Sequence, residues 1–355
     1  MSDLKYYDVM DDIKAYPEAW CYIVYGPRGS GKTYSALRAK KDPDGSPFIY
    51  LKRTKDDVDL ITAGAAYGTD FSPYKPINRD FGTNIQAQRI RRGIGMFWNY
   101  SEDGEQIGSP IGYIFSLNGT KNIKGFELSE CNWMVFDEFM PQKGERISRA
   151  EGDQLLDMYM TVARDREKRG KEPLKLILFA NSTEISSPVT NTLEVVDTMA
   201  DMVADGQLLY YDEKRKILFH QLSEGQYKIN SEENMAIADA MMNTQWGKMS
   251  FAGDFAYNDF SNIAYKSIKK MQPLIHLHYK NYDYYIYLAE DGSYYCCNSR
   301  QKCQIEYDLN LENDQKRFWL EWGIDLRNIC IDGRFTFQKY TMYDLLVNYK
   351  KFFEL

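Results

Sequence analysis

The sequence predicts an α/β protein that begins with a central, mostly parallel sheet, continues through a short helical linker and ends in a smaller α+β domain. Three observations predict this order. An apolar strand at residues 22–25 runs through a glycine-rich turn into a helix. Two further apolar strands, at residues 133–136 and 174–180, end in polar side chains. The last third is rich in tyrosine and turn residues, which favours antiparallel strands.

The chain of 355 residues is long enough for two domains, and its 44% apolar and 27% charged residues are ordinary for a folded protein. A formal net charge of −7 means that contact with nucleic acid has to come from local basic patches. The sequence contains no run of eighteen apolar residues and does not start with a basic and then apolar stretch. We therefore expect neither membrane insertion nor secretion, and we expect the six scattered cysteines to be reduced, partly buried thiols.

The turn after the first strand has the composition of a phosphate cradle. Its glycines allow backbone amides to turn inward around phosphate oxygens, and the following helix, expected to about Lys41, adds its positive N-terminal end. Lys32 would reach the β and γ phosphates, and the Thr33 hydroxyl would ligate Mg²⁺. A glycine-rich turn without a ligand is the alternative. The sequence predicts binding of ATP or GTP by the residues Gly26, Pro27, Arg28, Gly29, Ser30, Gly31, Lys32 and Thr33.

A second strand at residues 48–51 leads directly into Lys52, Arg53 and Lys55. In an open α/β sheet, ligands bind at the C-terminal ends of the strands. These cations are therefore candidates for contacts with phosphate or with a neighbouring subunit, and a solvated basic loop is the alternative. Residues 64–110 are expected to form an irregular insertion with a hairpin, followed by a strand at residues 111–117.

Two acids follow the apolar strand at residues 133–136. Asp137 would hold Mg²⁺ through its water shell, and Glu138 would polarise the attacking water. A strand that ends in Asp-Glu is weak evidence alone. It lies about a hundred residues after the glycine-rich turn, which is the spacing of a nucleotide-hydrolysing site. We therefore expect hydrolysis of the bound nucleotide.

A polar loop at residues 142–151 carries three basic residues, and a helix is expected at residues 152–164. The helix ends in Arg164, Asp165 and Arg166. Clustered arginines at the end of a helix can simply complement its dipole. The alternative is an arginine finger, which enters a neighbouring subunit's nucleotide site and offsets charge developing on the γ-phosphate.

The strand at residues 174–180 ends in Asn181, whose amide suits a sensor that hydrogen-bonds the γ-phosphate or the attacking water. A strand of this kind, inserted between the phosphate-loop strand and the acidic strand, is typical of the additional-strand class of P-loop ATPases (ASCE). A hairpin is expected at residues 208–220, and the first domain is expected to end at residue 222.

Residues 223–268 are expected to form a linker of short helices, and residues 269–355 a second domain. That domain has three predicted strands, at residues 273–279, 282–288 and 293–297, followed by a strand-like stretch at residues 329–337 and helices at residues 314–322 and 342–353. Three antiparallel strands with helices form the outline of an RNase H-like domain.

In their order and spacing, these motifs resemble those of the phi-29-like phage DNA-packaging motor ATPases, relatives of the large terminase subunits. The matching segments are residues 26–33, 48–53, 135–139, 161–166 and 180–182. The resemblance implies a homomeric ring, usually a pentamer, that hydrolyses ATP with Mg²⁺ and pushes double-stranded DNA into a procapsid. It implies a phage portal and in some cases a structural RNA as partners. It also implies residence in the host cytoplasm and, transiently, at the portal vertex.

The resemblance also implies roles for single residues. Arg164 looks like the finger that acts in trans, with Arg166 as its competitor, and Asn181 looks like the sensor. Arg53 and Lys55 look like basic residues near the subunit boundary. Family members grip DNA with basic loops that face the pore, and the candidates here are Lys143, Arg146 and Arg149.

One departure concerns the second domain. An RNase H-like nuclease needs clustered carboxylates for two metal ions, the first of them on its opening strand, and residues 274–279 contain no acid. We therefore predict a nuclease-inactive module that contacts the portal, DNA or a structural RNA. Two other classes of function remain open: a P-loop helicase or plasmid-partition ATPase, and a nucleotide-gated scaffold with little turnover.

Overall fold

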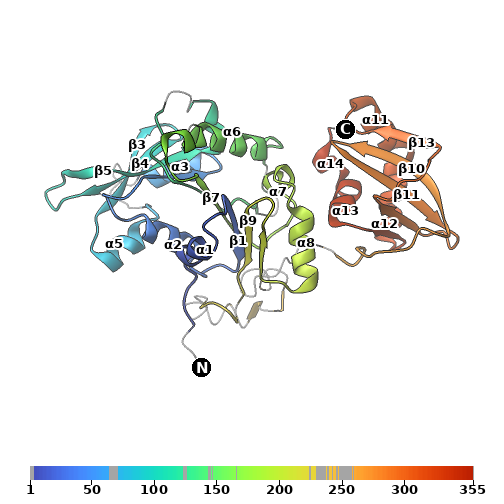
Figure 1. Cartoon of the computed structure of the whole chain (residues 1–355), viewed down its shortest axis with the longest axis horizontal. Coiled ribbons are helices and arrows are strands. Elements are labelled where there is room, and N and C mark those ends of the chain that lie inside the picture. Colours follow the sequence, from blue (N-terminus) through green and yellow to red (C-terminus); the bar gives the residue numbers. More distant parts are fainter. Residues whose placement is uncertain are drawn as a thin grey trace. The chain divides into compact units, whose positions relative to one another are not determined.

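The computed structural model describes residues 4–63, 71–122, 126–142, 145, 147–164, 166–223, 225–228, 258 and 260–354, together with isolated residues between 237 and 247. The chain forms two compact units (Figure 1). Unit 1 comprises residues 1–193 and 205–257, and unit 2 comprises residues 194–204 and 258–355. The expected linker at residues 223–268 lies largely outside the described residues, whereas the short segment 194–204 joins unit 2 from within the expected first domain.

Unit 1 is built on a nine-stranded sheet in the order β3-β4-β5-β2-β6-β7-β1-β9-β8. The six strands from β5 to β9 in this order run parallel to their neighbours, and β3, β4 and β8 add antiparallel strands at the two ends. The expected insertion of one strand between the phosphate-loop strand and the acidic strand is confirmed, because β7 lies between β1 and β6. The strands are β1 (Cys21–Gly26), β2 (Phe48–Lys52), β3 (Ile85–Arg91), β4 (Ile94–Tyr100), β5 (Gln106–Ser116), β6 (Trp133–Asp137), β7 (Lys175–Asn181), β8 (Leu209–Asp212) and β9 (Ile217–Gln221).

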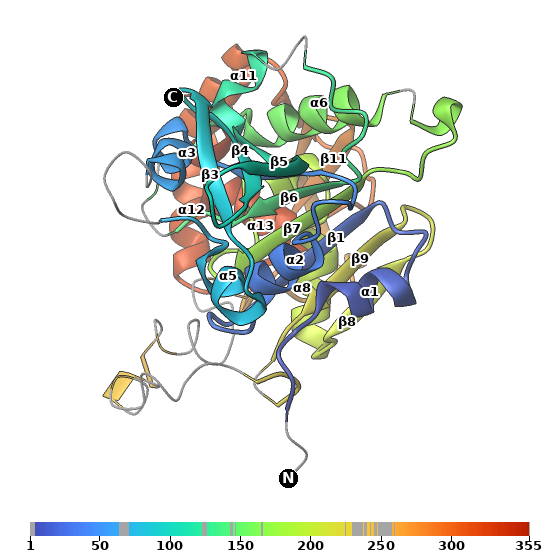
Figure 2. The ribbon, with the colours of Figure 1, turned by 90° about the vertical axis from the view of Figure 1, so that its left-hand side faces the viewer.

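The central strands are almost wholly buried, as their continuous apolar runs predict for a parallel sheet covered on both faces. Helices α1, α2 and α5 lie on one side of this sheet and α6 on the other (Figures 1 and 2). The helices of this part of the chain are α1 (Val9–Ala15), α2 (Lys32–Ala39), α3 (Lys55–Thr62), α5 (Lys75–Phe81), α6 (Glu151–Ala163), α7 (Pro188–Thr192) and α8 (Val196–Asp205), of which α8 lies almost entirely in unit 2.

The insertion between β2 and β6 is more regular than its glycine content predicts. It contains α3 and α5 as well as the expected hairpin of β3 and β4, and β5 begins at Gln106 rather than at residue 111. Helix α3 follows the second strand at once because Thr54 and Asp57 form a capping box, in which each side chain accepts from the other residue's backbone N–H. This turn directs the chain away from the end of β2 and leaves that end open to the neighbouring strand β6.

Unit 2 contains a five-stranded sheet in the order β13-β10-β11-β12-β14. The three expected antiparallel strands are present, and β13 adds in parallel to β10 and β14 in parallel to β12. This is the arrangement of an RNase H-like domain with one extra edge strand. Its elements are β10 (Met271–Tyr279), β11 (Tyr282–Ala289), β12 (Tyr294–Cys297), β13 (Ile305–Asp308), β14 (Phe335–Phe337), α11 (Glu312–Phe318), α12 (Ile324–Ile331), α13 (Tyr340–Val347) and α14 (Tyr349–Phe352).

Two further sequence expectations can be compared with this fold. All six cysteines are buried with free thiols, as expected. The strand-like stretch predicted at residues 329–337 is wrong in its first part, because helix α12 continues to Ile331 and only residues 335–337 pair in the sheet. Within the described part of the chain, no helix is long and apolar enough to cross a membrane.

Candidate nucleotide-binding and catalytic site

The glycine-rich turn links the end of β1 to the start of α2. Gly29 and Gly31 adopt φ values of 75° and 93°, a left-handed region that residues with a side chain rarely enter. Gly26 is required for a different reason. A Cβ at this position would lie 2.7 Å from the backbone oxygen of Leu222, which follows the neighbouring strand β9. Both constraints hold the turn in a conformation with its backbone close to the start of α2.

Lys32 lies inside this turn and is buried. Its Nζ donates to the carbonyl oxygens of Gly26 and Pro27, at 3.2 and 2.8 Å, and to Ser30 Oγ at 3.2 Å. Burial lowers the pKa of Lys32 to about 8, against the opposing effect of Asp137. A phosphate group in the turn would offer this ammonium a partner of opposite charge in place of neutral oxygens.

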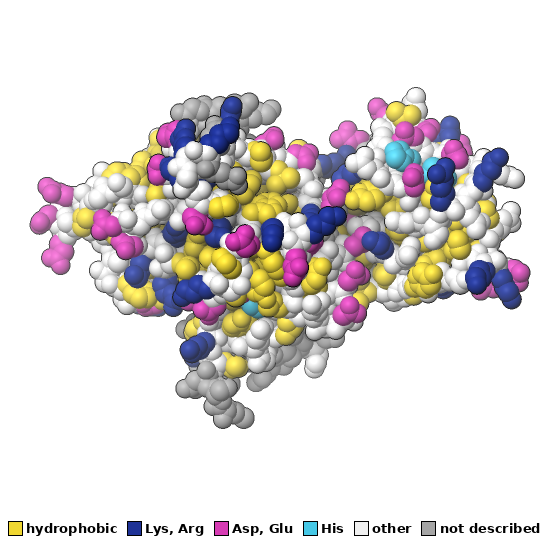
Figure 3. Space-filling model, viewed as in Figure 1, with side chains coloured by type: hydrophobic (Ala, Val, Ile, Leu, Met, Phe, Trp, Pro, Cys, Tyr) yellow, Lys and Arg dark blue, Asp and Glu magenta, His cyan; other side chains and the backbone are white. Residues whose placement is uncertain are grey.

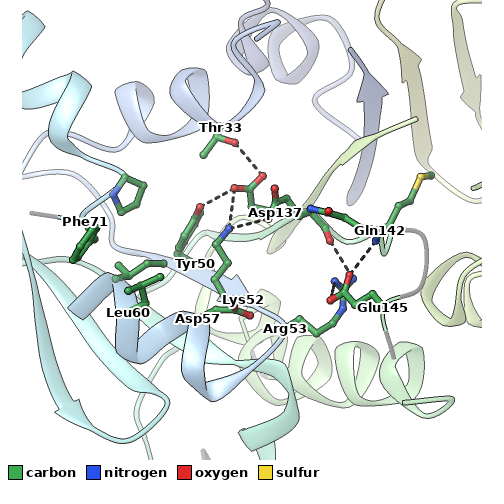
Figure 4. Close-up of a pocket in the computed structure, with 14 residues that line it drawn as sticks. Thr33, Tyr50, Lys52, Arg53, Asp57, Leu60, Phe71, Asp137, Gln142 and Glu145 are labelled. Carbon is green, nitrogen blue, oxygen red and sulfur yellow. Dashed lines mark hydrogen bonds and ion pairs between the residues drawn. The ribbon is translucent and has the colours of Figure 1, made fainter. Parts of the chain in front are cut away.

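Asp137, at the end of β6, accepts hydrogen bonds at both carboxylate oxygens. Thr33 Oγ1 donates to Oδ1 at 3.0 Å, and Tyr50 Oη donates to Oδ2 at 2.8 Å. Lys52 Nζ lies 3.3 Å from the same Oδ2 and 3.7 Å from the Glu138 carboxylate. Burial opposes the charge on Lys52, but these two carboxylates outweigh it, and the net effect raises its pKa. Figure 4 shows Tyr50 and Lys52 pointing toward Asp137, with Thr33 on the opposite side.

Glu138 follows Asp137 with φ of 60°, which is unusual for a residue other than glycine. The turn brings the chain back across the end of the sheet, where Phe139 N–H donates to Phe179 O of β7 at 3.0 Å. The side chain of Glu138 remains 56% exposed beside the partly buried Asp137 carboxylate. A carboxylate at this place is accessible to water and adjacent to the metal-binding position, as a general base requires.

A cavity of about 280 Å³ lies over the turn and is lined by residues 28–34, Asp137, Glu138, Ala180 and Asn181. Asn181 pairs in register with Gly26, because β7 and β1 are parallel neighbours. The structure therefore brings together the phosphate cradle, both acids and the sensor candidate. Thr33 and Asp137 are the residues that could hold Mg²⁺, and the backbone and Lys32 of the turn could hold the phosphates of ATP.

A larger cavity of about 700 Å³ adjoins this site through Thr33, Asp137 and Glu138 (Figure 4). Its other walls come from β2, from α3 and from the segment that follows β6. Asp57 and Glu145 add acidic groups, and Leu60 and Phe71 add exposed apolar ones. The lining also contains two cations, Lys52 and Arg53, which pair with Asp137, Glu138 and Glu145.

The two candidates for the arginine finger, Arg164 and Arg166, differ in how deeply they are buried. Arg164 caps the C-terminal end of α6 and is exposed. Arg166 is only 3% exposed and donates to the carbonyl oxygens of Ser129, Cys131 and Glu172. We therefore withdraw Arg166 as the competing finger, because a guanidinium enclosed among its own subunit's carbonyls cannot reach a neighbour. The candidate is Arg164 alone.

Arg53 is 7% exposed, and its guanidinium is bound by groups of its own chain. It also lines the larger cavity beside Glu138, and its expected place near a subunit boundary stays a prediction. Lys55, the first residue of α3, is half-buried and its side chain lies directly over Gly93. Its expected role at the boundary stays a prediction.

The DNA-binding candidates fall on the segment after β6. Lys143 and Arg146 lie outside the described residues, and Arg149 is exposed. Figure 3 shows that basic and acidic side chains are interspersed over the described part of the face in view. The expected DNA contact of Lys143, Arg146 and Arg149 stays a prediction.

The sequence analysis did not identify Tyr50, Glu145 and Glu151 as site residues, and it assigned Lys52 no partner. The sequence does contain a signal for Tyr50 and Lys52. Tyr50 and Lys52 are two residues apart on a strand and therefore share a face, and β2 is a direct neighbour of β6. Neighbouring parallel strands place their C-terminal residues together. The adjacency of β2 and β6 is a property of the sheet order, which the sequence did not specify.

The fold and the geometry of this site define the class as a P-loop ATPase domain of the additional-strand type, joined to an RNase H-like domain. No protein-family model and no curated protein matches the sequence. Two solved structures share the fold over nearly the whole chain. The first is the bacteriophage Phi-29 viral genome packaging motor assembly, with 17% sequence identity, a TM-score of 0.63 and an alignment that covers 98% of each chain. The Phi-28 gp11 DNA packaging motor has 16% identity, covers 98% of this chain and 96% of that one and has a TM-score of 0.61. The resemblance to the phi-29-like packaging ATPases, which the sequence motifs suggested, is confirmed at the level of the fold.

Proposed function

We propose that this chain is an ATPase subunit of a phage DNA-packaging motor, and that it moves double-stranded DNA into a procapsid. The observation that carries the proposal is the convergence of Lys32, Thr33, Asp137, Glu138 and Asn181 at one end of the sheet in a fold shared with two packaging motors. Bound Mg²⁺ would supply charge neutralisation at the phosphates. Glu138 would accept a proton from the attacking water, and Asn181 would orient that water.

We further propose that the site is completed across a subunit boundary in a homomeric ring. The larger cavity next to Glu138 supports this, because its volume of about 700 Å³ leaves room for a neighbour's side chain beside the γ-phosphate position. Exposed Arg164 is the cation we assign. The portal, a pentameric ring and a structural RNA remain expectations of the family resemblance. So do the host cytoplasm, the portal vertex and a nuclease-inactive second unit.

The test is ATP hydrolysis with and without double-stranded DNA. The samples are the wild type, Glu138→Gln, Arg164→Ala and an equimolar mixture of the two variants. Each variant supplies the group that the other lacks, so mixed rings contain complete sites. We expect DNA to stimulate the wild type, each variant to lose at least about a hundredfold in turnover, and the mixture to recover part of it. Glu290→Gln, an exposed residue of a turn in unit 2, is the matched control.

Other outcomes would favour the alternatives. Unwinding of a forked duplex would indicate a helicase. Absence of stimulation by DNA, together with full activity of Arg164→Ala, would remove the finger assignment and favour a nucleotide-gated scaffold. Nicking of supercoiled DNA by the full chain with Mg²⁺ or Mn²⁺ would contradict the nuclease-inactive assignment of unit 2.

A further inference from the structure

Arg53, at the end of β2, uses four hydrogen bonds to bind groups that are distant in sequence. Its Nη2 donates to the carbonyl oxygens of Glu138 and Phe139, at 3.1 and 2.8 Å. Its Nε donates to Glu151 Oε1 at 2.7 Å, and its Nη1 donates to Glu145 Oε1 at 2.9 Å. One buried side chain therefore ties the backbone of the candidate base to two carboxylates. Figure 4 shows Arg53 beside Glu145, one of the two.

The contact with the Glu138 carbonyl has a clear physical purpose. A glutamate with φ of 60° lies in a sparsely populated region of backbone conformation, which is unfavourable for a residue with a side chain. Such a conformation persists only when the surrounding structure determines it. The charged donor bonded to two successive carbonyl oxygens fixes the orientation of both peptide groups, and with them the direction in which the Glu138 side chain leaves the backbone.

The two carboxylates in turn fix the guanidinium. Glu151 is 1% exposed and is the first residue of α6, so its position is set by the helix. Burial raises the pKa of Glu151, and the adjacent Arg53 charge opposes this rise. Glu145 accepts from the backbone N–H of Gln142 through its other oxygen, at 3.0 Å. The face of the Phe136 ring lies 5.8 Å from the guanidinium carbon and completes the enclosure.

We propose that Arg53 is a positioning residue that acts on hydrolysis through the backbone of Glu138. The proposal rests on the proposed function in one respect, namely that Glu138 is the base for ATP hydrolysis. It does not require that the chain moves DNA. Arg53 would contact neither nucleotide nor metal, and its effect would appear in the rate of turnover and leave nucleotide binding unchanged.

Arg53→Lys is the main variant because it keeps the charge and most of the side chain but has a single nitrogen. One ammonium cannot serve two carbonyls and two carboxylates at these distances. We expect kcat to fall by about tenfold to a hundredfold, with KM for ATP and the directly measured affinity for a fluorescent ATP analogue changed by less than about twofold. Arg334→Lys, an exposed arginine paired with Asp332, is the matched control.

A double-mutant cycle separates positioning from simple loss of stability. In the Glu138→Gln background there is no base to position, so adding Arg53→Lys should reduce turnover by less than about twofold. Equal effects of Arg53→Lys in both backgrounds would overturn the proposal. So would a parallel rise in KM. Glu145→Gln, at the exposed side of the network, is the second variant if Arg53→Lys does not fold, and it should lower kcat by about threefold without changing KM.

The cycle is measured without DNA, so its outcome is independent of packaging. If the effects of Arg53→Lys and Glu138→Gln are additive while DNA stimulates ATP hydrolysis by the wild type, the positioning role of Arg53 is wrong and the motor proposal stands. If the two effects are non-additive while DNA does not stimulate the wild type, the positioning role of Arg53 is supported and the motor proposal is contradicted. A wild type without ATP turnover would remove both.

Discussion

Thr33 Oγ1 donates a hydrogen bond to Asp137 Oδ1 at 3.0 Å, which joins the phosphate turn to the acidic strand across 104 residues of sequence. Both oxygens of the carboxylate are oriented, because Tyr50 Oη donates to Oδ2 at 2.8 Å. Asp137 therefore has a fixed direction before any metal binds. Groups that orient a metal's ligands in this way usually affect metal affinity as well as structure.

Removal of the Tyr50 hydroxyl should weaken the use of Mg²⁺. In Tyr50→Phe the ring still fills its buried site, and Asp137 loses one donor. We expect the Mg²⁺ concentration for half-maximal ATP hydrolysis to rise about tenfold, with little change in kcat at saturating Mg²⁺. The measurement is a Mg²⁺ titration of hydrolysis, with Tyr210→Phe on the exposed edge strand β8 as the control. Identical titrations for Tyr50→Phe and the wild type would contradict the metal role of Asp137.

Nucleotide affinity should fall as pH rises through about 8. Burial lowers the pKa of Lys32 to about 8, below the ordinary value of 10.5 in an unfolded chain. Between these two pH values the unfolded chain binds more protons than the folded chain. The buried Lys32 charge therefore lowers the stability of the fold by its full amount below pH 8, and this loss of stability disappears as pH rises toward 10.5. Phosphate favours the charged amine, and binding above pH 8 should therefore take up a proton.

Calorimetric titration with Mg·ATP in buffers of different ionisation enthalpy measures this uptake directly. We expect a dissociation constant that increases by roughly tenfold per pH unit well above the lowered pKa, and heats that depend on the buffer. The control is the same titration at about pH 7, where Lys32 is charged before binding and the buffer should make little difference. An affinity that stays constant up to about pH 9.5 would show that Lys32 does not contact phosphate.

Replacing the two arginines near the end of α6, Arg164 and Arg166, should affect the stability of the fold to different extents. Arg166→Ala removes the guanidinium donor of the Cys131 carbonyl oxygen and leaves the Ser129 carbonyl oxygen with only the longer bond from Lys171, at 3.5 Å. We expect a loss of about 2–4 kcal/mol in the free energy of unfolding. Arg164→Ala removes an exposed side chain and should cost less than about 1 kcal/mol. Urea unfolding of each variant gives both values. A large loss for Arg164→Ala would identify it as a structural residue and undermine its use in mixing experiments.

Binding to double-stranded DNA should depend steeply on salt if the segment after β6 grips phosphates. Replacing Lys143, Arg146 and Arg149 with alanine should lower the slope of log affinity against log salt by about 2.7, since each phosphate contact contributes about 0.9. The effect should be the same for unrelated DNA sequences. The control replaces the exposed lysines Lys269, Lys270 and Lys280 of unit 2. An unchanged slope in the first variant would assign the DNA contact to another surface.

The sequence was sufficient for the elements that depend on neighbours in the chain. The turn at residues 26–33 needs glycine at two left-handed positions, and the strands that end in Asp137 and Asn181 are apolar runs with polar ends. Each of these patterns is read within about ten residues. Helix α5 and the first part of β5 were missed, because the glycine and turn residues at positions 64–110 predict irregular structure. Helix α3 lies before that insertion, and its capping box at Thr54 was not recognised.

The chemistry at the ends of the strands follows from local sequence patterns: a phosphate turn, two acids and an amide, in an order that matches one class of ATPase. Which cations lie in the interior depends instead on how distant segments pack together. Arg53 and Arg166 lie beside Lys52 and Arg164 in basic clusters of similar composition, yet the first two are buried. The reason is that a guanidinium is stable in the interior only where acceptors surround it. For Arg53 these acceptors are 85 to 98 residues away in the chain, and the sheet order alone brings them together.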